Sequence, residues 1–420
     1  MADTYCFKDH MSGETGSIGS QSGSTPVSVG AVTIATTVDE VEALRDRWRA
    51  IDVKDIDSDI DYFLTIVRCG GTTVRPYVVY IRREGGRDLL GISRIERVSL
   101  PLKFGYRKLV SPEFRAVVVT FGGIVGTRER ADEELLLDYL QGPLDTGDAD
   151  LLLLRNIDVN GTLYKAASAR GSCLRRSHGR EISGRWMARL PDTLDRFLEG
   201  RSSKTRQRLK GQDRKLLRDY AGRLRLHRFE NIEEMAELCR DMERVASRTY
   251  QRGLGAGFLN SSFDRALLEE TMRQGWHRTW MLYLDDVPVA FWTGTNYASN
   301  FAIGTPGFDP DYTKDSVGRF TMFRMVEDLC ADPTVSMLDF GYGEADYKTA
   351  FGECQRYEST VLITSRRPFP IAVNLAASLF SIVNSQGRRL IKETEWGRRL
   401  KRMWRGRAAA GGNAERPGGI

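Results

Sequence analysis

The stretch Asp339-Phe-Gly-Tyr-Gly-Glu-Ala-Asp-Tyr-Lys-Thr-Ala-Phe-Gly352 follows the short apolar run 335–340 and decides how the second half of the chain is interpreted. The apolar run predicts a strand. The glycines after it predict a tight turn, because glycine adopts backbone conformations closed to other residues. In α/β folds a strand that opens into a polar loop is a usual place for a site. The candidate catalytic residues are therefore Asp339, Glu344, Tyr347 and Lys348.

Two interpretations of this turn stay open from the residues alone. In the first, a carboxylate or the Tyr347 hydroxyl transfers a proton, and Lys348 contacts a phosphate or a substrate carboxylate. In the second, the turn is structural, Asp339 holds the strand end and Tyr347 packs on Lys348. The sequence pattern fits both equally, so the surrounding fold has to decide between them.

A second candidate site precedes the first by one predicted helix. Residues 291–331 have the pattern of a strand, a turn-rich loop and a helix, and the loop ends at 316–319. The start of a helix offers unpaired N–H groups and the positive end of a dipole, which together bind phosphate. The competing interpretation makes Ser316 an ordinary helix cap. The candidate cofactor-binding residues are Ser316, Val317, Gly318 and Arg319.

Length and composition limit the class of protein. The chain has 420 residues and 41% hydrophobic content, which is enough for two globular domains. No window holds about 18 uninterrupted apolar residues, and the start has no secretory signal pattern. Residues 1–30 are rich in Gly, Ser and Thr, so we expect disorder there. The six cysteines and four histidines lack metal-ligand spacing, so no metal site is predicted.

Basic residues gather in two blocks. Residues 196–228 hold twelve Lys/Arg against three acidic residues, and residues 387–407 hold nine against two. In the first block, Lys204, Arg208, Lys215 and Arg218 fall on one stripe of a predicted helix, which fits either a solvated face or an anionic partner. The second block interleaves its cations with apolar residues such as Trp396 and Trp404, which fits either an anionic membrane surface or docking onto the protein itself.

The order of predicted elements indicates an α/β (α+β) protein with two domains of mixed sheets and a helical tail. Each half offers helices, a hairpin, a glycine-bearing connection, a helix and a strand. In the first half they include an amphipathic helix at 38–51 and a strand at 183–189. In the second half they include helices at 263–274 and 319–331 and a hairpin of 280–284 with 287–295 around the turn Asp285-Asp286, and an apolar segment follows at 371–383. In the first half the glycines form the run Phe121-Gly-Gly-Ile124, which is too little to assign a site there. The expected divisions are a disordered start at 1–30, domains at 31–190 and 191–365, a basic amphipathic tail at 366–407 and a disordered end at 408–420.

Several motifs in this order resemble one bacterial family. They are Lys204-Thr-Arg-x-x-Leu209, Val287-Pro-Val-Ala290, Asp309-Pro-Asp-Tyr312 with Ser316-Val-Gly318, and Asp339-Phe-Gly-x-Gly343 with Tyr347-Lys-x-x-Phe-Gly352. Together they resemble the acetyltransferase-like family linked to cellulose or exopolysaccharide biosynthesis, within the GNAT superfamily. The chain is also similar to the Fem-type peptidyltransferases, which share a tandem GNAT architecture.

The resemblance implies two tandem GNAT-like domains, the second of which (191–365) is the acyltransferase domain, and a transfer of an acyl group from acetyl-CoA or another acyl-CoA to an amine or hydroxyl. It implies that pyrophosphate binds at 316–319, that Tyr347 is the acid, and that Asp339 or Glu344 is the base. Lys348 would neutralise a phosphate or the charge of the acceptor. The acceptor would be a small molecule or a saccharide.

One departure from the family leaves the donor open. The usual GNAT pyrophosphate loop, Arg/Gln-x-x-Gly-x-Gly/Ala, is missing before Arg319. Another acyl carrier or an aminoacyl-tRNA, as in Fem-type enzymes, is the alternative donor. Fem-type enzymes that use tRNA often carry a long coiled-coil arm, and the basic segment 204–220 is too short for one, which favours the acyl-CoA. No nucleic acid other than tRNA is expected. A third hypothesis is a non-catalytic accessory protein at a membrane. We expect a bacterial cytoplasmic protein, with the basic tail as a means of peripheral attachment to the inner membrane.

Overall fold

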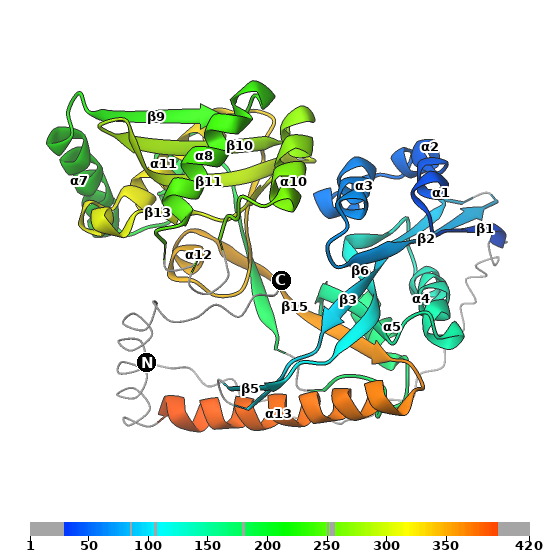
Figure 1. The fold of residues 1–420 in the computed structure, drawn as a ribbon. Coiled ribbons are helices and arrows are strands. Elements are labelled where there is room, and N and C mark those ends of the chain that lie inside the picture. The colour runs from blue at the N-terminus through cyan, green and yellow to red at the C-terminus, as the bar shows by residue number, and fades with distance from the viewer. Residues whose placement is uncertain are drawn as a thin grey trace, which may run out of the picture.

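The computed structural model describes residues 29–393, except 85, 105–106, 179–180, 250–251 and 253–256. Disorder was expected at 1–30 and 408–420; residues 1–28, 408–420 and the tail from 394 to 407 lie outside the described residues, whereas Val29 and Gly30 begin the strand β1, so the expectation is wrong for these two. Figure 1 shows two lobes with the long helix α13 along their lower end. The elements of the first lobe are β1 (Val29–Ala35), α1 (Val38–Glu42), α2 (Arg45–Arg49), the 3-10 helix η1 (Ile56–Ser58), α3 (Ile60–Cys69), β2 (Thr73–Arg83), β3 (Leu89–Ser99), β4 (Leu102–Phe104), β5 (Arg107–Val110), β6 (Glu113–Val125), α4 (Arg130–Thr146), β7 (Leu151–Asp158) and α5 (Thr162–Ala169).

The second lobe begins after the strand β8 and ends before the strand β15, both of which run between the lobes. Its elements, with these two strands and the last helix, are β8 (Ser183–Arg189), α6 (Leu194–Phe197), α7 (Ser203–Asp219), β9 (Leu224–Phe229), η2 (Ile232–Glu234), α8 (Met235–Ala246), α10 (Ser262–Arg273), β10 (His277–Leu284), β11 (Val287–Tyr297), β12 (Asn300–Ile303), β13 (Gly307–Phe308), η3 (Pro310–Asp315), α11 (Val317–Ala331), β14 (Met337–Tyr342), α12 (Asp346–Phe351), β15 (Glu353–Thr364) and α13 (Pro368–Glu393).

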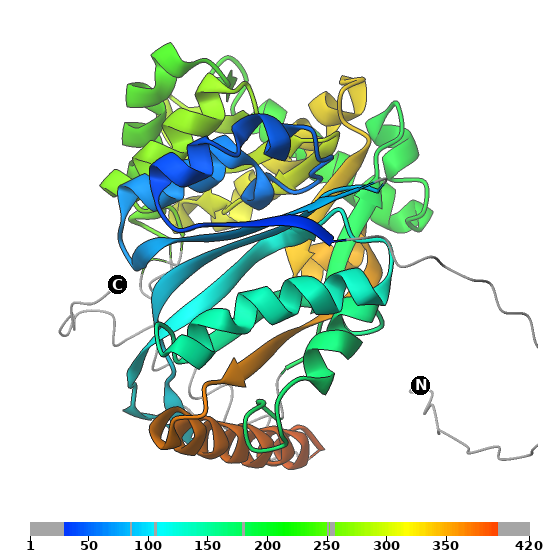
Figure 2. The same ribbon diagram turned by 90° about the vertical axis from the view of Figure 1, so that its right-hand side faces the viewer.

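A single mixed sheet of 13 strands runs through both lobes in the order β1-β2-β3-β6-β7-β15-β8-β14-β12-β11-β10-β9, with β13 added beside β11. Strands β4 and β5 form a separate hairpin. The large mixed sheet with helices packed on it confirms the predicted α/β class. Figure 2 shows the strong twist of this sheet between the two lobes.

The same arrangement occurs twice within the sheet. In the first lobe, β6 and β7 are parallel and are connected through α4. In the second lobe, β12 and β14 are parallel and are connected through α11. A parallel pair needs such a crossover, and the helix of each crossover covers the sheet. The predicted repetition of pattern in the two halves is therefore a repetition of structure.

The two repeats exchange strands at their junction. Strand β8, which precedes the second repeat in the chain, pairs with β14, and β15 pairs with both β7 and β8. The sheet thus continues across residue 190, where the sequence predicted a division between domains. Because each repeat borrows an antiparallel strand from the other part of the chain, the two lobes are held together by backbone hydrogen bonds.

Each crossover helix packs on its own part of the sheet. Leu136, Leu140 and Leu144 of α4 pack with strand residues such as Val117 and Leu152. Helix α11 buries nine of its residues, of which Met322, Phe323 and Val326 pack with Trp280, Phe301 and Leu338. Apolar burial on this scale contributes about 25 cal/mol per Å² and fixes the helix starts relative to the strand ends.

Most predicted elements are present, with informative exceptions. The predicted hairpin turn at Asp285 and Asp286 is confirmed, and both residues have positive φ, as a tight two-residue turn requires. The predicted helix at 38–51 is wrong in its continuity: it breaks into α1 and α2, which lets Trp48 pack 5.5 Å from Phe63. The sequence did not predict β15, α5 or α12.

A buried histidine gives the fold a testable response to acid. His277 on β10 lies with its Nε2 2.8 Å from Thr279 Oγ1, and burial lowers the pKa of His277 from 6.5 to about 3. The unfolded chain therefore binds a proton below pH 6.5 that the folded chain does not, and stability falls as the pH drops from 6.5 towards 3. We expect the wild type to lose about 2 kcal/mol more than His277→Gln between pH 8 and pH 5 in urea unfolding. Equal losses in the two proteins would contradict this assignment.

Candidate functional site

The parallel strands β12 and β14 of the second lobe separate at their carboxyl ends. Strands β12 and β14 pair only from Asn300 with Met337 to Ala302 with Asp339. Beyond these residues β14 continues to Tyr342 without β12, and a register shift against β8 follows Asp339. Gly341 and Gly343 both have positive φ, which is the conformation for which glycine was expected there. The parallel pair is therefore splayed at its carboxyl end.

Asp339 lies at this opening and is firmly held. Its side chain is buried with 1% exposure, accepts a hydrogen bond from Gly341 N–H at 2.8 Å through Oδ1, and forms an ion pair with Arg185 of β8 through Oδ2. Both carboxylate oxygens thus have a donor, one from the backbone and one from a guanidinium. This geometry suits a side chain that orients the strand end and Arg185.

Lys348 and Tyr347, on the short helix α12, flank the same opening. Lys348 Nζ donates a hydrogen bond to the carbonyl oxygen of Tyr342 at 2.7 Å, and burial lowers the pKa of Lys348 while nearby Asp339 opposes this shift. The ring of Tyr347 packs edge-on against Trp292 at 5.6 Å and against Phe340 at 6.1 Å. The structure therefore brings three of the four predicted catalytic residues to one strand end.

Glu344, the fourth predicted catalytic residue, lies in the turn between β14 and α12 and is exposed to solvent. Water reaches its carboxylate directly. Of the two predicted bases, Asp339 is held by its ion pair with Arg185, whereas Glu344 faces solvent.

The predicted anion site is at the start of α11. Ser316 stands at the N-cap position of this helix, as the competing interpretation expected, but it has positive φ and its side chain makes no capping hydrogen bond. Val317 is buried, and the carbonyl oxygen of Gly318 accepts a hydrogen bond from Trp292 Nε1 at 2.6 Å. A Cβ at position 318 would lie 3.3 Å from the Phe308 ring, so the chain is tightly packed there. A helix start that is not capped by its own side chain fits a phosphate group.

Arg319 is placed differently from the other three predicted cofactor-binding residues. Burial lowers the pKa of Arg319, and the charges that act on it are those of Asp213 and Arg208 on α7. Its guanidinium therefore lies on the α7 side of α11. The N–H groups of Arg319 and Phe320 donate to the carbonyl oxygen of Ser316, so the part of this terminus that can receive an anion consists of the backbone N–H groups of Val317 and Gly318 and not of a glycine-rich loop.

Charged side chains from distant segments surround Asp339, and the sequence did not predict them. Besides its pair with Asp339, Arg185 lies 3.6 Å from Glu358 Oε1, and its guanidinium carbon is 4.3 Å from the centre of the Phe121 ring. Arg356 Nε donates a hydrogen bond to Glu358 Oε1 at 2.8 Å. Burial raises the pKa of Glu358, and Arg356 and Arg185 oppose this shift. We call Arg185, Asp339, Arg356 and Glu358 the junction cluster.

The first lobe adds aspartates to the junction. Burial raises the pKa values of Asp55, Asp57 and Asp59, and Arg185 and Arg356 oppose the shift at Asp55. Tyr297 of the second lobe donates a hydrogen bond to Asp59 Oδ2 at 3.1 Å and links the lobes. The sequence contains a pattern that could have indicated these residues, because aspartates occupy every second or third position from Asp52 to Asp61.

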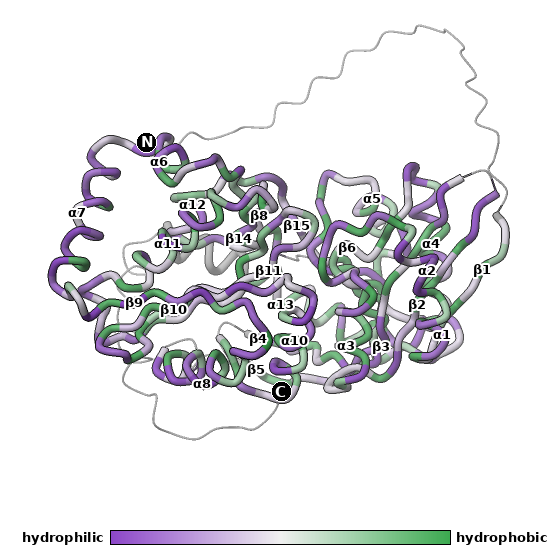
Figure 3. The backbone as a smooth tube through the Cα atoms, turned by 90° about the horizontal axis from the view of Figure 1, so that it is seen from above, coloured by the Kyte–Doolittle hydropathy of each residue, from purple (hydrophilic) through white to green (hydrophobic). Residues whose placement is uncertain are grey.

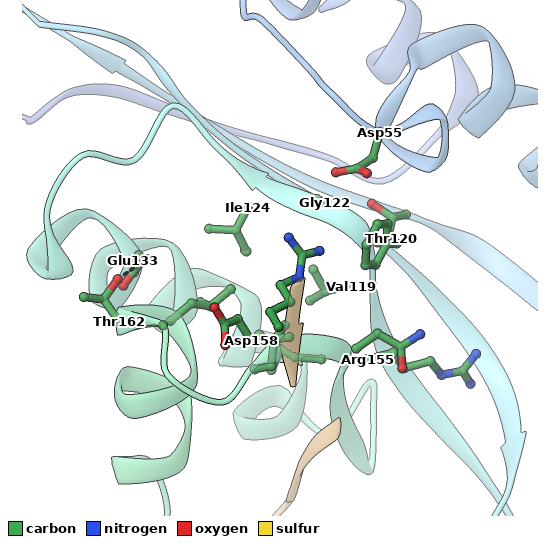
Figure 4. Close-up of a pocket in the computed structure, with 17 residues that line it drawn as sticks. Asp55, Val119, Thr120, Gly122, Ile124, Glu133, Arg155, Asp158 and Thr162 are labelled. Atoms are coloured by element: carbon green, nitrogen blue, oxygen red, sulfur yellow. Dashed lines mark hydrogen bonds between the residues drawn. The ribbon is translucent and has the colours of Figure 1, made fainter. Parts of the chain in front are cut away.

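A cavity of about 280 Å³ lies between β6 and β7, where the first repeat opens like the second. Figure 4 shows Asp55 at its upper side, Glu133 and Thr162 at one end and Asp158 near its centre. Glu133 Oε1 accepts a hydrogen bond from Thr162 Oγ1 at 2.8 Å, and no partner among the described residues satisfies its Oε2. We call this cavity the first-lobe pocket.

The first-lobe pocket differs from the opening in the second lobe in its charge. The start of α4 carries a capping box of Glu129 and Asp132, and Glu133 follows directly. These carboxylates occupy the positive end of the helix dipole and repel a phosphate. Position 122 needs a glycine, because its φ is +66° and a Cβ there would collide with the Asp55 carboxylate. This repeat is therefore suited to polar or cationic groups and not to pyrophosphate.

A second cavity, of about 500 Å³, lies on the other side of the same strands. Leu153 lines this cavity, whereas its neighbour on β7, Leu154, lines the first-lobe pocket. Successive side chains of a strand point to opposite faces of the sheet, so the two cavities lie on opposite faces. Tyr342 and Glu358 line it at the junction, and Pro101 lines it near the β4–β5 hairpin. The junction cluster is thus open to cavities on both faces of the sheet.

Two further observations concern metals and membranes. Within the described parts of the chain, no group of three or more His, Cys, Asp or Glu side chains has the arrangement of a metal site. None of the helices in the described residues combines the length and apolar character needed to cross a bilayer.

One protein family and several solved structures are similar to this chain. Residues 203–349 match the Acetyltransferase (GNAT) domain family. The crystal structure of FemX is similar to the chain at 10% identity and a TM-score of 0.54, covering 82% of this chain and all of that one. A tandem GNAT protein from the clavulanic acid biosynthesis pathway (13% identity, TM-score 0.47, 80% and 99% covered) and a conserved protein of unknown function from Bacteroides thetaiotaomicron (11%, 0.47, 79% and 100%) are also similar.

No curated protein matches the sequence. The family match covers both the opening between β12 and β14 and the start of α11, and the likeness to FemX shows the fold over 82% of the chain. The exopolysaccharide family stays a prediction. Residues 203–349 are thus similar to the acetyltransferase (GNAT) domain family, within a mixed α/β chain whose fold is similar to that of FemX.

Proposed function

We propose that the protein transfers an acyl group from an acyl-CoA such as acetyl-CoA to a hydroxyl or amine of an acceptor at the junction between the lobes. One observation carries the proposal: the opening between β12 and β14 has the uncapped start of α11 on one side and Lys348 beside Asp339 on the other. Within a GNAT-type domain, these are the groups that an acyl donor with a phosphate end needs.

The donor is bound by the second lobe in this proposal. Its pyrophosphate lies on the backbone N–H groups around Ser316, where the helix dipole is positive. Its thioester reaches the splayed strand ends beside Lys348. The first-lobe pocket does not compete for the donor, because Glu129, Asp132 and Glu133 occupy the corresponding helix start.

The chemistry needs a proton acceptor, an oxyanion partner and a proton donor. The acceptor nucleophile attacks the thioester carbonyl carbon and gives up its proton, the C–S bond breaks, and the thiolate takes a proton. Lys348 stabilises the oxyanion that forms on the carbonyl oxygen. Glu344, which is exposed, receives the proton of the nucleophile, and the Tyr347 hydroxyl protonates the thiolate. Asp339 and Arg185 orient the strand end.

The acceptor lies in the first-lobe pocket in this proposal. The pocket carries carboxylates at Asp55 and Asp158, an amide at Asn156 and the cation of Arg356, all of which can hydrogen-bond sugar hydroxyls. The resemblance of the sequence to polysaccharide-biosynthesis enzymes agrees with a saccharide or cell-envelope acceptor. The transferred group is then an acetyl or another short acyl group.

The donor site is tested by calorimetric titration with acetyl-CoA. Ser316→Asp introduces a negative charge at the start of α11, where aspartate is a good helix cap and is tolerated at positive φ. Ser316→Asn has the same shape without the charge and serves as the control. We expect the wild type and Ser316→Asn to bind, and Ser316→Asp to bind at least about tenfold more weakly, or 1.4 kcal/mol. Absent binding to the wild type, or equal binding to both variants, would overturn the assignment.

The exposed basic face of α7 favours aminoacyl-tRNA as a second candidate donor. Lys204, Arg208, Lys215 and Arg218 are all exposed, and α7 is the strongly hydrophilic helix at the outer edge of Figure 3. A gel shift with charged tRNA distinguishes the donors. A shift that vanishes in Lys204→Gln/Arg208→Gln/Lys215→Gln would support tRNA, and an absent shift at low salt would exclude it.

A further inference from the structure

The last described helix, α13, lies on the protein with its polar side inward. Asn374 and Ser378 are buried, Asn374 Nδ2 donates a hydrogen bond to the carbonyl oxygen of Arg176 at 3.0 Å, and Ser378 Oγ accepts one from His178 N–H at 3.0 Å. Val373 and Ala377 add apolar contacts to the core. The helix is thus attached to the first lobe by polar side chains that most surface helices point to water.

The outward side of α13 is apolar. Ala372, Leu375, Ala376, Leu379 and Val383 follow one another at helical spacing on the side away from Asn374 and Ser378. Leu379 is 61% exposed and Val383 is 45% exposed. An outward apolar stripe on a helix that is bound through its polar side indicates a surface with a partner.

The β4–β5 hairpin extends this stripe. Asn384 Nδ2 of α13 donates a hydrogen bond to the carbonyl oxygen of Lys103 at 2.8 Å, which fixes the hairpin beside the helix. Leu109 and Val110 on β5 are 58% and 54% exposed. Figures 1 and 2 both show α13 and the hairpin side by side at one end of the molecule. We call the stripe of α13 with Leu109 and Val110 the apolar base.

Cations lie at both ends of the apolar base. Arg366 and Arg367 precede α13 and are exposed, although Arg367 pairs with Asp150 at 3.1 Å, and Lys103 is exposed on the hairpin beside Asn384. In the sequence, further Lys and Arg follow between positions 388 and 407, with Trp396 and Trp404 among them. Such a combination of an apolar helix face with cations attracts an anionic lipid surface, at roughly 1 kcal/mol for each cation near it.

We propose that the apolar base is a docking surface for an anionic membrane. Helix α13 lies in the plane of the interface, with Leu379 and Val383 among the lipid headgroups and acyl ends. A second copy of the chain fits less well, because a two-fold contact would bring the same cations of both copies together. The proposal is independent of the acyl donor, so its failure would leave the proposed function untouched.

Flotation of the full chain with vesicles tests this surface. Vesicles of phosphatidylcholine and phosphatidylglycerol in equal amounts are compared with phosphatidylcholine alone, at about 50 mM and about 500 mM salt. We expect the wild type to float with the anionic vesicles at low salt and to be released at high salt. Leu379→Glu/Val383→Glu should lower the bound fraction at least about tenfold, because it buries charge and adds repulsion.

The control variant is Leu217→Glu, which places the same change on α7, at an exposed leucine far from the apolar base. It should float like the wild type, and thermal unfolding should show that all variants are folded. Flotation of Leu379→Glu/Val383→Glu equal to that of the wild type, or loss of flotation in Leu217→Glu, would overturn the proposal. A wild type that does not float and is a dimer that the double variant dissociates, by sedimentation velocity, would assign the surface to a second copy instead.

Discussion

Replacing Lys348 by methionine is expected to slow acyl transfer about 10²–10³-fold, the effect of removing one donor to a developing oxyanion. The ammonium group lies at the splayed end of β14, where Lys348 Nζ donates to the carbonyl oxygen of Tyr342 at 2.7 Å. Methionine keeps the length and apolar body of the side chain without its charge. The rate is measured as the release of CoA thiol from acetyl-CoA with a panel of saccharide and amino-sugar acceptors.

Two comparison variants define what Lys348 does. Lys348→Arg keeps the positive charge and should retain about a tenth of the rate, because a guanidinium still stabilises an oxyanion although its geometry differs. Tyr347→Phe removes only the hydroxyl, and should affect kcat without changing the binding of acetyl-CoA. A rate for Lys348→Met within a factor of three of the wild type would remove Lys348 from the chemistry and leave the turn as a structural feature.

Replacing Arg185 by methionine is expected to destabilise the protein by about 3–5 kcal/mol, because it removes the ion-pair partner of buried Asp339 and one of the two cations beside buried Glu358. Asp339 and Glu358 each have a side chain that is 1% exposed, and Arg185 is paired with both. The ring of Phe121 also loses the cation above it. The measurement is urea unfolding at pH 7.

The charge balance of the junction cluster supplies the control. Arg185→Met/Asp339→Asn should recover part of the lost stability, because it also removes the negative charge of Asp339, which the single variant leaves without its ion-pair partner. Arg356→Met should cost only about 1 kcal/mol, since this side chain is 40% exposed and solvent screens its pair with Glu358. A loss below about 1 kcal/mol in Arg185→Met would mean that the cluster does not hold the lobes together.

Local patterns predicted much of the second lobe. Alternation and turn chemistry predicted the β10–β11 hairpin and its Asp285–Asp286 turn, because both are set by residues close in the chain. Helical spacing predicted α10 and α11 within two residues at each end. The glycines after β14 predicted its turn for the same reason, since Gly341 and Gly343 need backbone conformations that few residues adopt.

Local patterns did not predict which strands pair. Strand β15 has no clear apolar alternation in its first half, from Glu353 to Tyr357, because these residues run between the lobes and are exposed or half-buried in turn, with none of them in the core. Strand β8 was predicted as a strand, but its position between β15 and β14 depends on pairing with residues more than a hundred positions away. The helix α13 was recognised as apolar, whereas its inward polar side was visible only against the first lobe.

By itself, the sequence determined the repeated order of helices and strands, the turn at Gly341 and the position of Asp339, Tyr347 and Lys348 at one strand end. Only the tertiary structure decided that Arg185 is the partner of Asp339 across 154 residues, and that the first lobe brings aspartates and a pocket to the same junction. The physical reason is that backbone conformation follows from neighbours in the chain, whereas the burial and the charge partners of a side chain follow from strands that meet in space.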